Sequence, residues 1–558
     1  MGATTTETVI PVPLGLPVPP FTPHAISVSL PTWRDNVGYE EGDKRVMDSM
    51  VCGYPRFFIG LGIQKLANIC AQKFGAPGES AMLFPTQKTA DACRSFIHDR
   101  SSLEGAPAHA RLIQLLICPE DKANKAVLVN SEDCNCNGSA SLLDLHIVLF
   151  PMEAFPLAKQ FWQHCGAGIS SRLAEQCLSL LPEGSPSITS SPPPPFARRI
   201  PFKTSNRHYS VKETRRVSPP TAVEDLNADH SVYLEERYGR NLPITAAAAA
   251  KRALRRRISG VLLRDDRSSD NAGDQNLQLG PSARGVSEVS ETDVYLYPGG
   301  MNAIWNAHQL ALGTRPPAKS VCFGFPYIDT LKVLQKWGPG CHFLGHGLDS
   351  DIDELENILE EESKLDPSKP PILALFTEPT TSPKLADKYD FLIVVDETVG
   401  NFMNVEVLPF ADMVVSSLTK VFSGSSNVMG GSLVLNPKRR HYASLKSYLE
   451  LNYEDIYFDE DAIFMERNSR DVQRRIKVID HNTETISASH AFFDALPCHK
   501  GPSLGTNFTL ASPFTILAHF TELDWAAQYG VEADLDTDVL LAGFDLALKA
   551  AKAAHETS

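Results

Sequence analysis

Five short apolar runs, separated by polar or amphipathic stretches, lie in the second half of the chain. They are residues 294–297, 321–323, 372–376, 391–395 and 413–416, and the amphipathic stretch 301–312 follows the first of them. Alternating strand and helix signals in this order predict an α/β fold, with a mostly parallel sheet and helices on both faces. Ligands of such sheets bind at the carboxyl ends of the strands. We therefore expect a functional site just past the ends of these runs.

Two ionisable residues follow two of these runs. Asp396 comes directly after 391–395, and Lys420 comes shortly after 413–416. A lysine held against the end of a buried strand loses hydration, which disfavours its ammonium form and makes the amine available for a Schiff base. A carboxylate paired with the pyridine nitrogen of pyridoxal phosphate (PLP) keeps that nitrogen protonated, so that the ring can accept electrons. The pair makes the chain a candidate PLP enzyme, although Asp396 could also simply cap the next segment.

Composition divides the 558 residues into several parts, which is enough chain for two or three domains. A stretch with Pro192-Pro193-Pro194-Pro195 and many serines and arginines predicts a flexible linker. The expected parts are a flexible N-terminus (1–24), an N-terminal α/β extension (25–181), the linker (182–230), a large PLP-binding domain (231–480) with a surface insertion (264–291), and a C-terminal domain (481–558).

The bulk properties exclude several classes of protein. The 67 acidic against 52 basic residues argue against a nucleic-acid partner. No apolar run reaches the length of a membrane span. The 11 cysteines follow no repeating spacing, and Cys134-Asn135-Cys136 lacks a second pair, so we expect reduced thiols and no metal site. A globular cytoplasmic protein is the expectation.

A glycine pair joins one apolar run to the amphipathic stretch that follows it, in Pro298-Gly299-Gly300-Met301. Glycines at such a junction let backbone N–H groups approach a phosphate, and a helix N-terminus adds a favourable dipole. The pair could equally be a plain turn. A fainter pattern is an internal echo, in which Tyr54-Pro55-Arg56 resembles Tyr238-Gly239-Arg240. The echo is either a duplication without the phosphate glycines or chance.

Four motifs in this order resemble the Cys/Met-metabolism family of PLP-dependent enzymes, and most of all its fungal cystathionine γ-synthases. The motifs are Tyr238-Gly239-Arg240-Asn241, Pro298-Gly299-Gly300-Met301, Asp396-Glu397-Thr398 and Ser417-Leu418-Thr419-Lys420. The resemblance covers roughly residues 234–480 and, more loosely, 497–517. It implies an aspartate-aminotransferase-like (type I) fold, an extended N-terminal region, and a homo-oligomer, dimer or tetramer, whose sites are shared between subunits.

The resemblance also implies roles for single residues. Lys420 would carry the cofactor and move protons at the substrate's Cα and Cβ, and Asp396 would pair with the pyridine nitrogen. The phosphate would be bound by the following groups: the backbone N–H groups of Gly300 and Met301, the hydroxyls of Ser417 and Thr419, and Tyr238 and Arg240 of a neighbouring subunit. Without the resemblance, Arg240 could be a surface residue, and the two hydroxyls could belong to caps or loops.

The sequence departs from the family pattern at two cofactor positions. Where the family places an aromatic ring over the cofactor, commonly a tyrosine, the matching residue is Phe323. Phenylalanine can stack but cannot transfer a proton, so that role is absent or passes to Tyr327. Ser382 stands where an asparagine usually faces the cofactor's phenolic oxygen.

The C-terminal part departs further. Ser503-Leu504-Gly505-Thr506 resembles the family's turn on the substrate side, but residues 486–492 are a shortened segment of the C-terminal α+β domain. The family's arginine strand, which clamps the substrate carboxylate, has no counterpart, because no arginine follows Arg475. Either an ordinary enzyme has been truncated or misassembled, or a divergent protein handles its substrate differently.

The resemblance implies a transferase of transsulfuration and methionine biosynthesis. The expected reaction is γ-replacement on an O-acylhomoserine by cysteine, which gives cystathionine. Two alternatives stay open. One is another γ-elimination or γ-replacement with sulfide or a carbon nucleophile, and the other is a catalytically impaired PLP-binding homologue. The expected partners are small amino-acid substrates and further copies of the chain.

Overall fold

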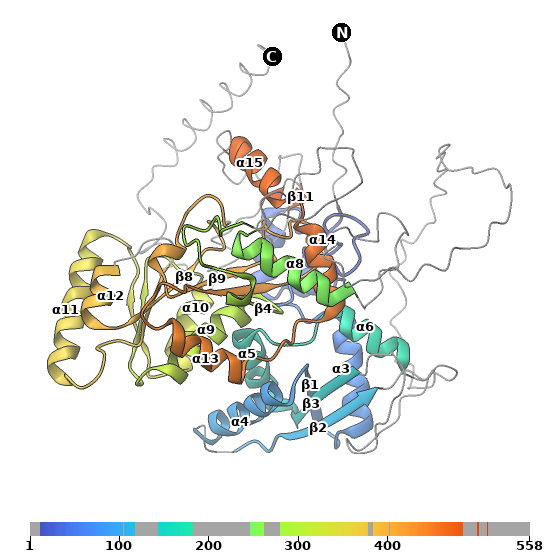
Figure 1. Cartoon of the computed structure of the whole chain (residues 1–558). Helices are drawn as coiled ribbons and strands as arrows, with labels where there is room; N and C mark the ends of the chain where they lie inside the picture. The colour runs from blue at the N-terminus through green and yellow to red at the C-terminus, as the bar shows by residue number, and fades with distance from the viewer. Residues whose placement is uncertain are drawn as a thin grey trace, which may run out of the picture.

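A seven-stranded sheet forms the centre of the larger part of the molecule (Figure 1). The computed structural model describes residues 12–103, 105, 107–117, 143–181, 246–261, 280–377, 383–400, 402–483, 499–500 and 510–511. The strand order is β4 (Val294–Tyr297), β10 (Gly431–Leu435), β9 (Met413–Ser417), β8 (Leu392–Asp396), β7 (Ala374–Thr377), β5 (Ser320–Phe323) and β6 (Cys341–Leu344). Strands β9, β8, β7, β5 and β6 are parallel neighbours, and β10 runs antiparallel to β9 and β4. The prediction of a mostly parallel sheet is confirmed.

Helices cover both faces of this sheet. One face buries its apolar side chains against α8 (Ala247–Ser259), α11 (Asp349–Leu365), α12 (Pro383–Tyr389), α14 (Asp459–Asn468) and α15 (Val472–Thr483). The other face packs on α9 (Gly300–Thr314), α10 (Ile328–Lys336) and α13 (Tyr442–Asn452). The strands are buried on both sides, which explains why they read as continuous apolar runs rather than as alternating ones.

The N-terminal part is a separate α/β unit built on an antiparallel sheet in the order β1 (Glu79–Phe84), β3 (Leu143–Pro151), β2 (Arg111–Ile117). Helices α3 (Leu61–Phe74) and α6 (Ser171–Leu180) pack on one face, and α4 (Gln87–Leu103) and α5 (Phe155–Cys165) on the other. The N-terminal unit also includes the described residues before α3, from residue 12, which contain the short helices α1 (Trp33–Glu41) and α2 (Lys44–Met47).

The described residues also form three short 3₁₀ turns and one short pair of strands. They are the 3₁₀ turns η1 (Met152–Ala154), η3 (Glu291–Asp293) and η4 (Leu408–Phe410), and the parallel pair β11 (His499–Lys500) and β12 (Leu510–Ala511). Most of the expected linker and C-terminal domain lies outside the described residues. In the part of the chain that is described, no helix is both long and apolar enough to cross a membrane.

The described end of the expected surface insertion (264–291), from residue 280, carries three buried residues among exposed and half-buried ones. Arg284, Val286 and Val289 are buried, and the two valines belong to the same apolar core as α8. The polar composition of the segment hid these residues, because a buried arginine with a partner reads in sequence like a surface one.

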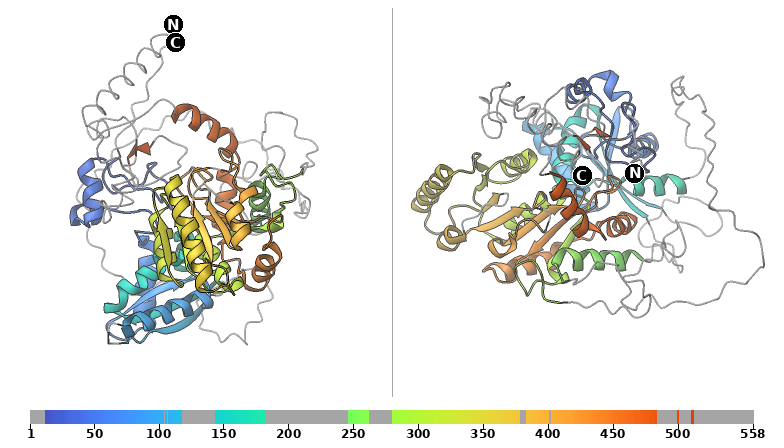
Figure 2. Two further views of the ribbon diagram at one scale, coloured as in Figure 1. Left: turned by 90° about the vertical axis from the view of Figure 1, so that its left-hand side faces the viewer. Right: turned by 90° about the horizontal axis from the view of Figure 1, so that it is seen from above.

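The N-terminal unit packs against the helices of the large sheet, as the views of Figures 1 and 2 agree. Aromatic rings from α4 and α5 meet two tryptophans of the large domain: Phe96 lies 4.4 Å from Trp337 between ring centroids, and Phe161 lies 6.0 Å from Trp305. Arg172 and Asp461 form a buried ion pair at 2.9 Å between α6 and α14. Tilted and edge-to-face aromatic contacts and a buried ion pair therefore join the N-terminal unit to the large domain.

His164 makes this contact sensitive to acid. Its Nδ1 accepts a hydrogen bond from the Trp337 Nε1–H at 3.0 Å, and burial lowers the pKa of His164 to about 4. An ordinary histidine has a pKa of about 6.5, so between about pH 6.5 and 4 this side chain is protonated in the unfolded chain but not in the folded protein. The free energy of unfolding therefore falls as the pH drops through this range. We expect His164 to account for about 3 kcal/mol of this loss.

The measurement is the free energy of unfolding by urea at several pH values, in the wild type and in His164→Gln. The slope between pH 6.5 and 4 should be shallower in the variant. His98 is exposed, so His98→Gln serves as the control and should keep the wild-type slope. Parallel slopes in wild type and His164→Gln would contradict the prediction.

Candidate cofactor site at the strand ends

Asp396 ends the central strand β8 and faces a pocket. Its Oδ1 accepts hydrogen bonds from the backbone N–H and the hydroxyl of Thr398, at 3.0 and 2.6 Å. Burial raises the pKa of the Asp396 carboxyl, and the two bonds from Thr398 offset this only in part. Within the described residues, no basic side chain lies at ion-pair distance from Asp396. A carboxyl group in this setting is suited to a ligand that shares a proton with it.

Thr398 connects Asp396 to the end of the neighbouring strand. Its hydroxyl, which donates to Asp396, accepts a bond from the Ser417 backbone N–H at 2.8 Å. The register places Asp396 opposite Val415, so β8 and β9 end at the same edge of the sheet. One threonine therefore fixes the position of the carboxylate relative to the segment that leads to Lys420.

The start of α9 forms a cradle beside Ser417. The helix begins at Gly300, and no side chain caps its N-terminus. A Cβ atom at Gly300 would lie 2.6 Å from the Ser417 Cβ, so only glycine allows the helix to begin this close to the end of β9. The backbone N–H groups of Gly300 and Met301 belong to the first turn, where a helix binds anions well. The cradle suits a phosphate group.

Lys420 lies in the turn that follows β9. The turn is closed by a hydrogen bond from the Gly424 N–H to the Lys420 carbonyl at 2.8 Å. The side chain is half-buried, and its Nζ lies 4.3 Å from the centre of the Tyr54 ring. Lys420 therefore lies three residues beyond the cradle serine, and its amine rests on the N-terminal unit.

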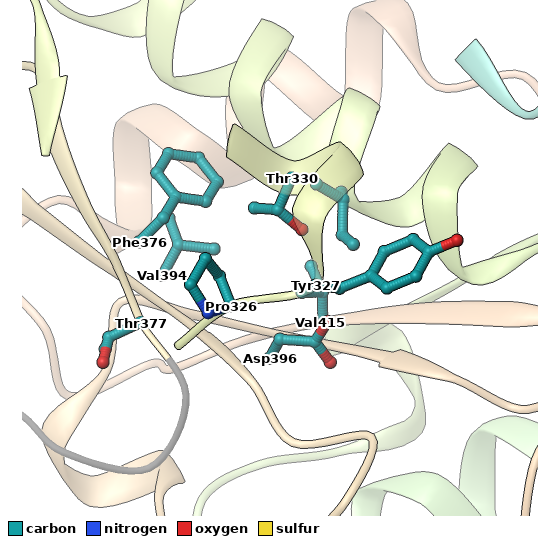
Figure 3. A pocket seen from close by; sticks show the side chains of 9 residues that line it. Pro326, Tyr327, Thr330, Phe376, Thr377, Val394, Asp396 and Val415 are labelled. Atoms are coloured by element: carbon teal, nitrogen blue, oxygen red, sulfur yellow. The ribbon is translucent and has the colours of Figure 1, made fainter. Parts of the chain in front are cut away.

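The pocket that Asp396 faces lies between β7, β8, β9 and the segment that enters α10 (Figure 3). Its lining residues are Ile304, Pro326, Tyr327, Thr330, Phe376, Thr377, Val394, Asp396 and Val415. Asp396 is the only carboxylate among them, and Tyr327 brings the only phenol. The walls of the pocket are mostly apolar and carry few polar groups.

Phe323, which is expected to stack on the cofactor, is not among the residues that line this pocket. Phe323 lies inside β5 and packs with Val321 and Val395 in the core on one face of the sheet, whereas Val394 packs on the other face. Side chains alternate along a strand, so Phe323 points away from the face on which Asp396 lies. Tyr327 lines the pocket instead, and burial raises the pKa of its phenol.

The structure also changes the expected role of Thr419. Its hydroxyl donates to the Gly430 carbonyl at 3.2 Å and accepts from the Gly430 N–H at 3.1 Å. A hydroxyl has a single proton to donate, so Thr419 has none left for a phosphate in this arrangement. The other expected site residues Tyr238, Arg240, Ser382 and Ser503 lie outside the described residues.

A buried ion pair stands directly behind Asp396. Arg284 donates from Nη2 to both carboxylate oxygens of Glu397, at 2.5 and 2.6 Å, and from Nη1 to the Ile258 carbonyl at 2.7 Å. Both side chains are buried. Burial raises the pKa of Glu397, and the neighbouring guanidinium offsets part of that rise. The pair anchors the chain immediately after the end of β8.

Arg284→Met is expected to lower the free energy of unfolding by about 3–5 kcal/mol, because it leaves the Glu397 carboxylate buried without its partner. Urea unfolding measures this loss. The double variant Arg284→Met/Glu397→Gln removes the unpaired charge and should recover part of the stability. A double variant no more stable than the single one would show that charge burial is not the cause.

Sequence reasoning left Thr398, Tyr54 and Arg56 without a role. Thr398 belongs to the motif Asp396-Glu397-Thr398, but a hydrogen bond between two strand ends has no sequence signature. Arg56 is buried, forms an ion pair with Asp329, and its guanidinium lies 5.7 Å from the centre of the Tyr327 ring. The echo between Tyr54-Pro55-Arg56 and Tyr238-Gly239-Arg240 was the only signal that pointed to this segment.

These features define a class of protein. The structure joins a half-buried carboxylate at a central strand end, a glycine cradle at a helix N-terminus, and a lysine in the turn beyond the next strand, on a mostly parallel sheet with helices on both faces. This is a PLP-dependent enzyme of the aspartate-aminotransferase-like fold, in which Asp396, Gly300 and Lys420 suit the ring nitrogen, the phosphate and the aldehyde of the cofactor.

Known proteins specify the family. Residues 62–170 match the fungal trans-sulfuration enzyme, N-terminal domain. The cystathionine gamma-synthase-like enzyme iboG2 of Amanita muscaria is 48% identical, with 99% of this chain and 100% of that protein covered. The cystathionine gamma-synthase of Neurospora crassa is 39% identical, with 97% and 99% covered. A solved cystathionine gamma synthase from Xanthomonas oryzae pv. oryzae is 17% identical, covers 56% of this chain and 100% of its own, and gives a TM-score of 0.33.

The chain belongs to the Cys/Met-metabolism family of PLP-dependent enzymes, among its cystathionine γ-synthase-like members. The relatives are not uniform in function, since one that is 32% identical is named an alanine racemase, ungC of Aspergillus violaceofuscus.

Proposed function

We propose that this protein catalyses γ-replacement on an O-acylhomoserine with cysteine, which gives cystathionine. The Cγ–O bond to the acyl group breaks, the cysteine sulfur bonds to Cγ, and the acyl group leaves as a carboxylic acid with the thiol proton. The observation that carries the proposal is the joint placement of Asp396, Gly300 and Lys420 at one sheet edge, in a chain whose relatives include named cystathionine γ-synthases.

The residues would divide the work as follows. When bound, PLP withdraws electrons from an amino-acid substrate, so that protons next to its reacting carbons become removable. Lys420 holds the cofactor and then moves protons at Cα and Cβ. Asp396 holds the proton of the ring nitrogen, kept in place by Thr398. The N–H groups of Gly300 and Met301 bind the phosphate, with Ser417 beside them, and Tyr327 presents its ring to the pocket.

Assembly and location follow from the same proposal. The family resemblance assigns Tyr238 and Arg240 to the phosphate of a neighbouring subunit, so we expect a dimer or tetramer with shared sites. Methionine biosynthesis in the cytoplasm is the expected setting. Ser382 and Ser503 are proposed to contact the cofactor's phenolic oxygen side and the substrate.

A second candidate is a family member with altered or impaired substrate handling. Two observations favour it: no arginine follows Arg475, and the alignment with iboG2 spans 649 positions although this chain has 558 residues. The relative therefore carries segments that this chain lacks. Without a substrate clamp, catalysis would fall by roughly two orders of magnitude or more, because orientation supplies much of the rate.

Product analysis separates the candidates. The full chain, loaded with PLP, is incubated with O-acetylhomoserine and either cysteine or sulfide, and the products are identified by mass spectrometry. Cystathionine formed with cysteine supports the first proposal. Homocysteine formed from sulfide without cystathionine points to another nucleophile, and an intact cofactor absorption band without any product points to the impaired homologue.

A further inference from the structure

The N-terminal unit reaches into the lysine site through one tyrosine. Tyr54 is 9% exposed and lies before α3, and its ring face lies 4.3 Å from the Lys420 Nζ. The electron-rich face of an aromatic ring attracts a cation at this distance, and more strongly where water is excluded. A ring from the N-terminal unit thus meets the side chain on which the proposed chemistry depends.

Arg56, two residues on, contacts the segment that enters α10, where Tyr327 lines the pocket. It is 3% exposed, forms an ion pair with Asp329 at the start of α10, and its guanidinium lies 5.7 Å from the centre of the Tyr327 ring. Burial raises the pKa of Asp329, but Arg56, Lys332 and the other nearby groups together bring it below its ordinary value. Arg56 therefore connects the N-terminal unit to the tyrosine that lines the pocket.

The segment that carries both residues is itself held in place. The Phe57 and Phe58 N–H groups donate to the Tyr54 carbonyl at 2.9 and 3.0 Å, and Gln163 Nε2 of α5 donates to the Arg56 carbonyl at 3.0 Å. A second contact of the unit supports the cradle, because Asn302 donates to the Cys165 carbonyl at 2.7 Å. The unit therefore touches the site at the lysine, at Tyr327 and behind the helix start.

We propose that Tyr54-Pro55-Arg56 completes the Lys420 site within the same chain. Tyr54 positions the Lys420 amine through the face of its ring, and Arg56 is a positioning residue for Tyr327. The inference rests on the proposed function in one respect, namely that Lys420 is the cofactor lysine. The proposal gives the N-terminal unit a part in the active site that the residues of the large sheet do not supply.

The test replaces the ring at position 54 without changing its shape. In the full chain without added cofactor, Tyr54 is replaced by phenylalanine, then by mono- and trifluorophenylalanine, which weaken the negative ring face in steps. The labelling of Lys420 by an amine-reactive reagent at neutral pH is followed by mass spectrometry, with the exposed Lys364 as internal reference. An amine held against the ring reacts more slowly than a free one, so the labelling rate reports how firmly the ring holds the Lys420 amine.

We expect the phenylalanine variant to label within about twofold of the wild type, and the trifluorophenylalanine variant roughly fivefold faster. Tyr54→Leu should be faster still, and Phe57→Leu, which removes a neighbouring ring that lies on Arg56 rather than on Lys420, should match the wild type. A flat rate across the fluorinated series would overturn the proposal.

The two proposals can fail separately. Borohydride trapping of PLP, followed by peptide mapping, tests whether Lys420 carries the cofactor, and the labelling series does not depend on it. If trapping finds no cofactor on Lys420 while the series changes as expected, then the proposed function fails and the Tyr54 contact stands. If trapping succeeds while the series stays flat, then only the role of Tyr54 fails.

Discussion

Lys420→Ala is expected to abolish the visible absorption band that the protein acquires with PLP and to reduce turnover to background. The amine is the only group of the described site that can bond to the cofactor aldehyde, and it is also the proposed carrier of protons at Cα and Cβ. Loss of proton transfer alone costs roughly 10²–10⁴-fold in rate. Absorption spectroscopy of the loaded protein and product formation from O-acetylhomoserine with cysteine measure the two effects.

Lys446→Ala is the matched control. Lys446 also lies over a tyrosine ring, at 5.4 Å from the centre of Tyr295, but it stands on α13 and pairs with Asp293. This variant should keep both the band and the turnover. An absorption band of wild-type strength in Lys420→Ala would refute the assignment of the cofactor lysine and, with it, the proposed chemistry.

The sheet could be predicted where its strands are buried on both faces. The five apolar runs correspond to β4, β5, β7, β8 and β9, but β6 and β10 were not among them. Strand β6 lies at the edge of the sheet and keeps three of its four residues half-buried, so it shows no apolar run. Strand β10 begins with Gly431-Ser432, whose small residues read as a turn.

The site could be predicted to the extent that ligands bind at the carboxyl ends of parallel strands. Parallel strands end at one edge, so Asp396 and Ser417 had to be neighbours, and the turn with Lys420 had to begin there. The choice between Phe323 and Tyr327 needed the end of β5, because one side chain lies inside the strand and the other beyond it. Strand boundaries read from sequence are uncertain by a few residues, which is enough to exchange one of these aromatic residues for the other at the pocket.

The contribution of the N-terminal unit was beyond the reach of local patterns. Tyr54 and Arg56 meet Lys420 and Asp329, which are hundreds of residues away in sequence, through a docking surface made of rings and a buried ion pair. No periodicity or motif encodes which surfaces of two units will meet. Even the echo of Tyr-x-Arg could only suggest a shared ancestry, since it carried no information on where the first copy lies.

Asp396→Asn is expected to lower kcat by roughly 10²–10³-fold, the loss that follows removal of one preorganised electrostatic partner from a buried site. Asparagine keeps the shape and can still accept the hydrogen bonds of Thr398, but it cannot hold the ring nitrogen of PLP in its protonated form. The cofactor should still bind through Lys420, so the visible band should persist, shifted in position. Steady-state kinetics and the absorption spectrum of the loaded variant test this separation of binding from turnover.

Asp412→Asn provides the control for loss of a buried carboxylate as such. Asp412 is 1% exposed, accepts from the Ile393 N–H at 2.8 Å and pairs with Arg439 at 3.3 Å, outside the lining of the pocket. Its replacement should lower the melting temperature and leave the band position and kcat of the folded protein close to wild type. Equal losses of kcat in the two variants would mean that Asp396 acts through the stability of the sheet edge. A loss confined to Asp396→Asn ties the electron-accepting role of the cofactor to this one carboxylate, because Asp412 is the more deeply buried of the two aspartates and only Asp396 faces the pocket.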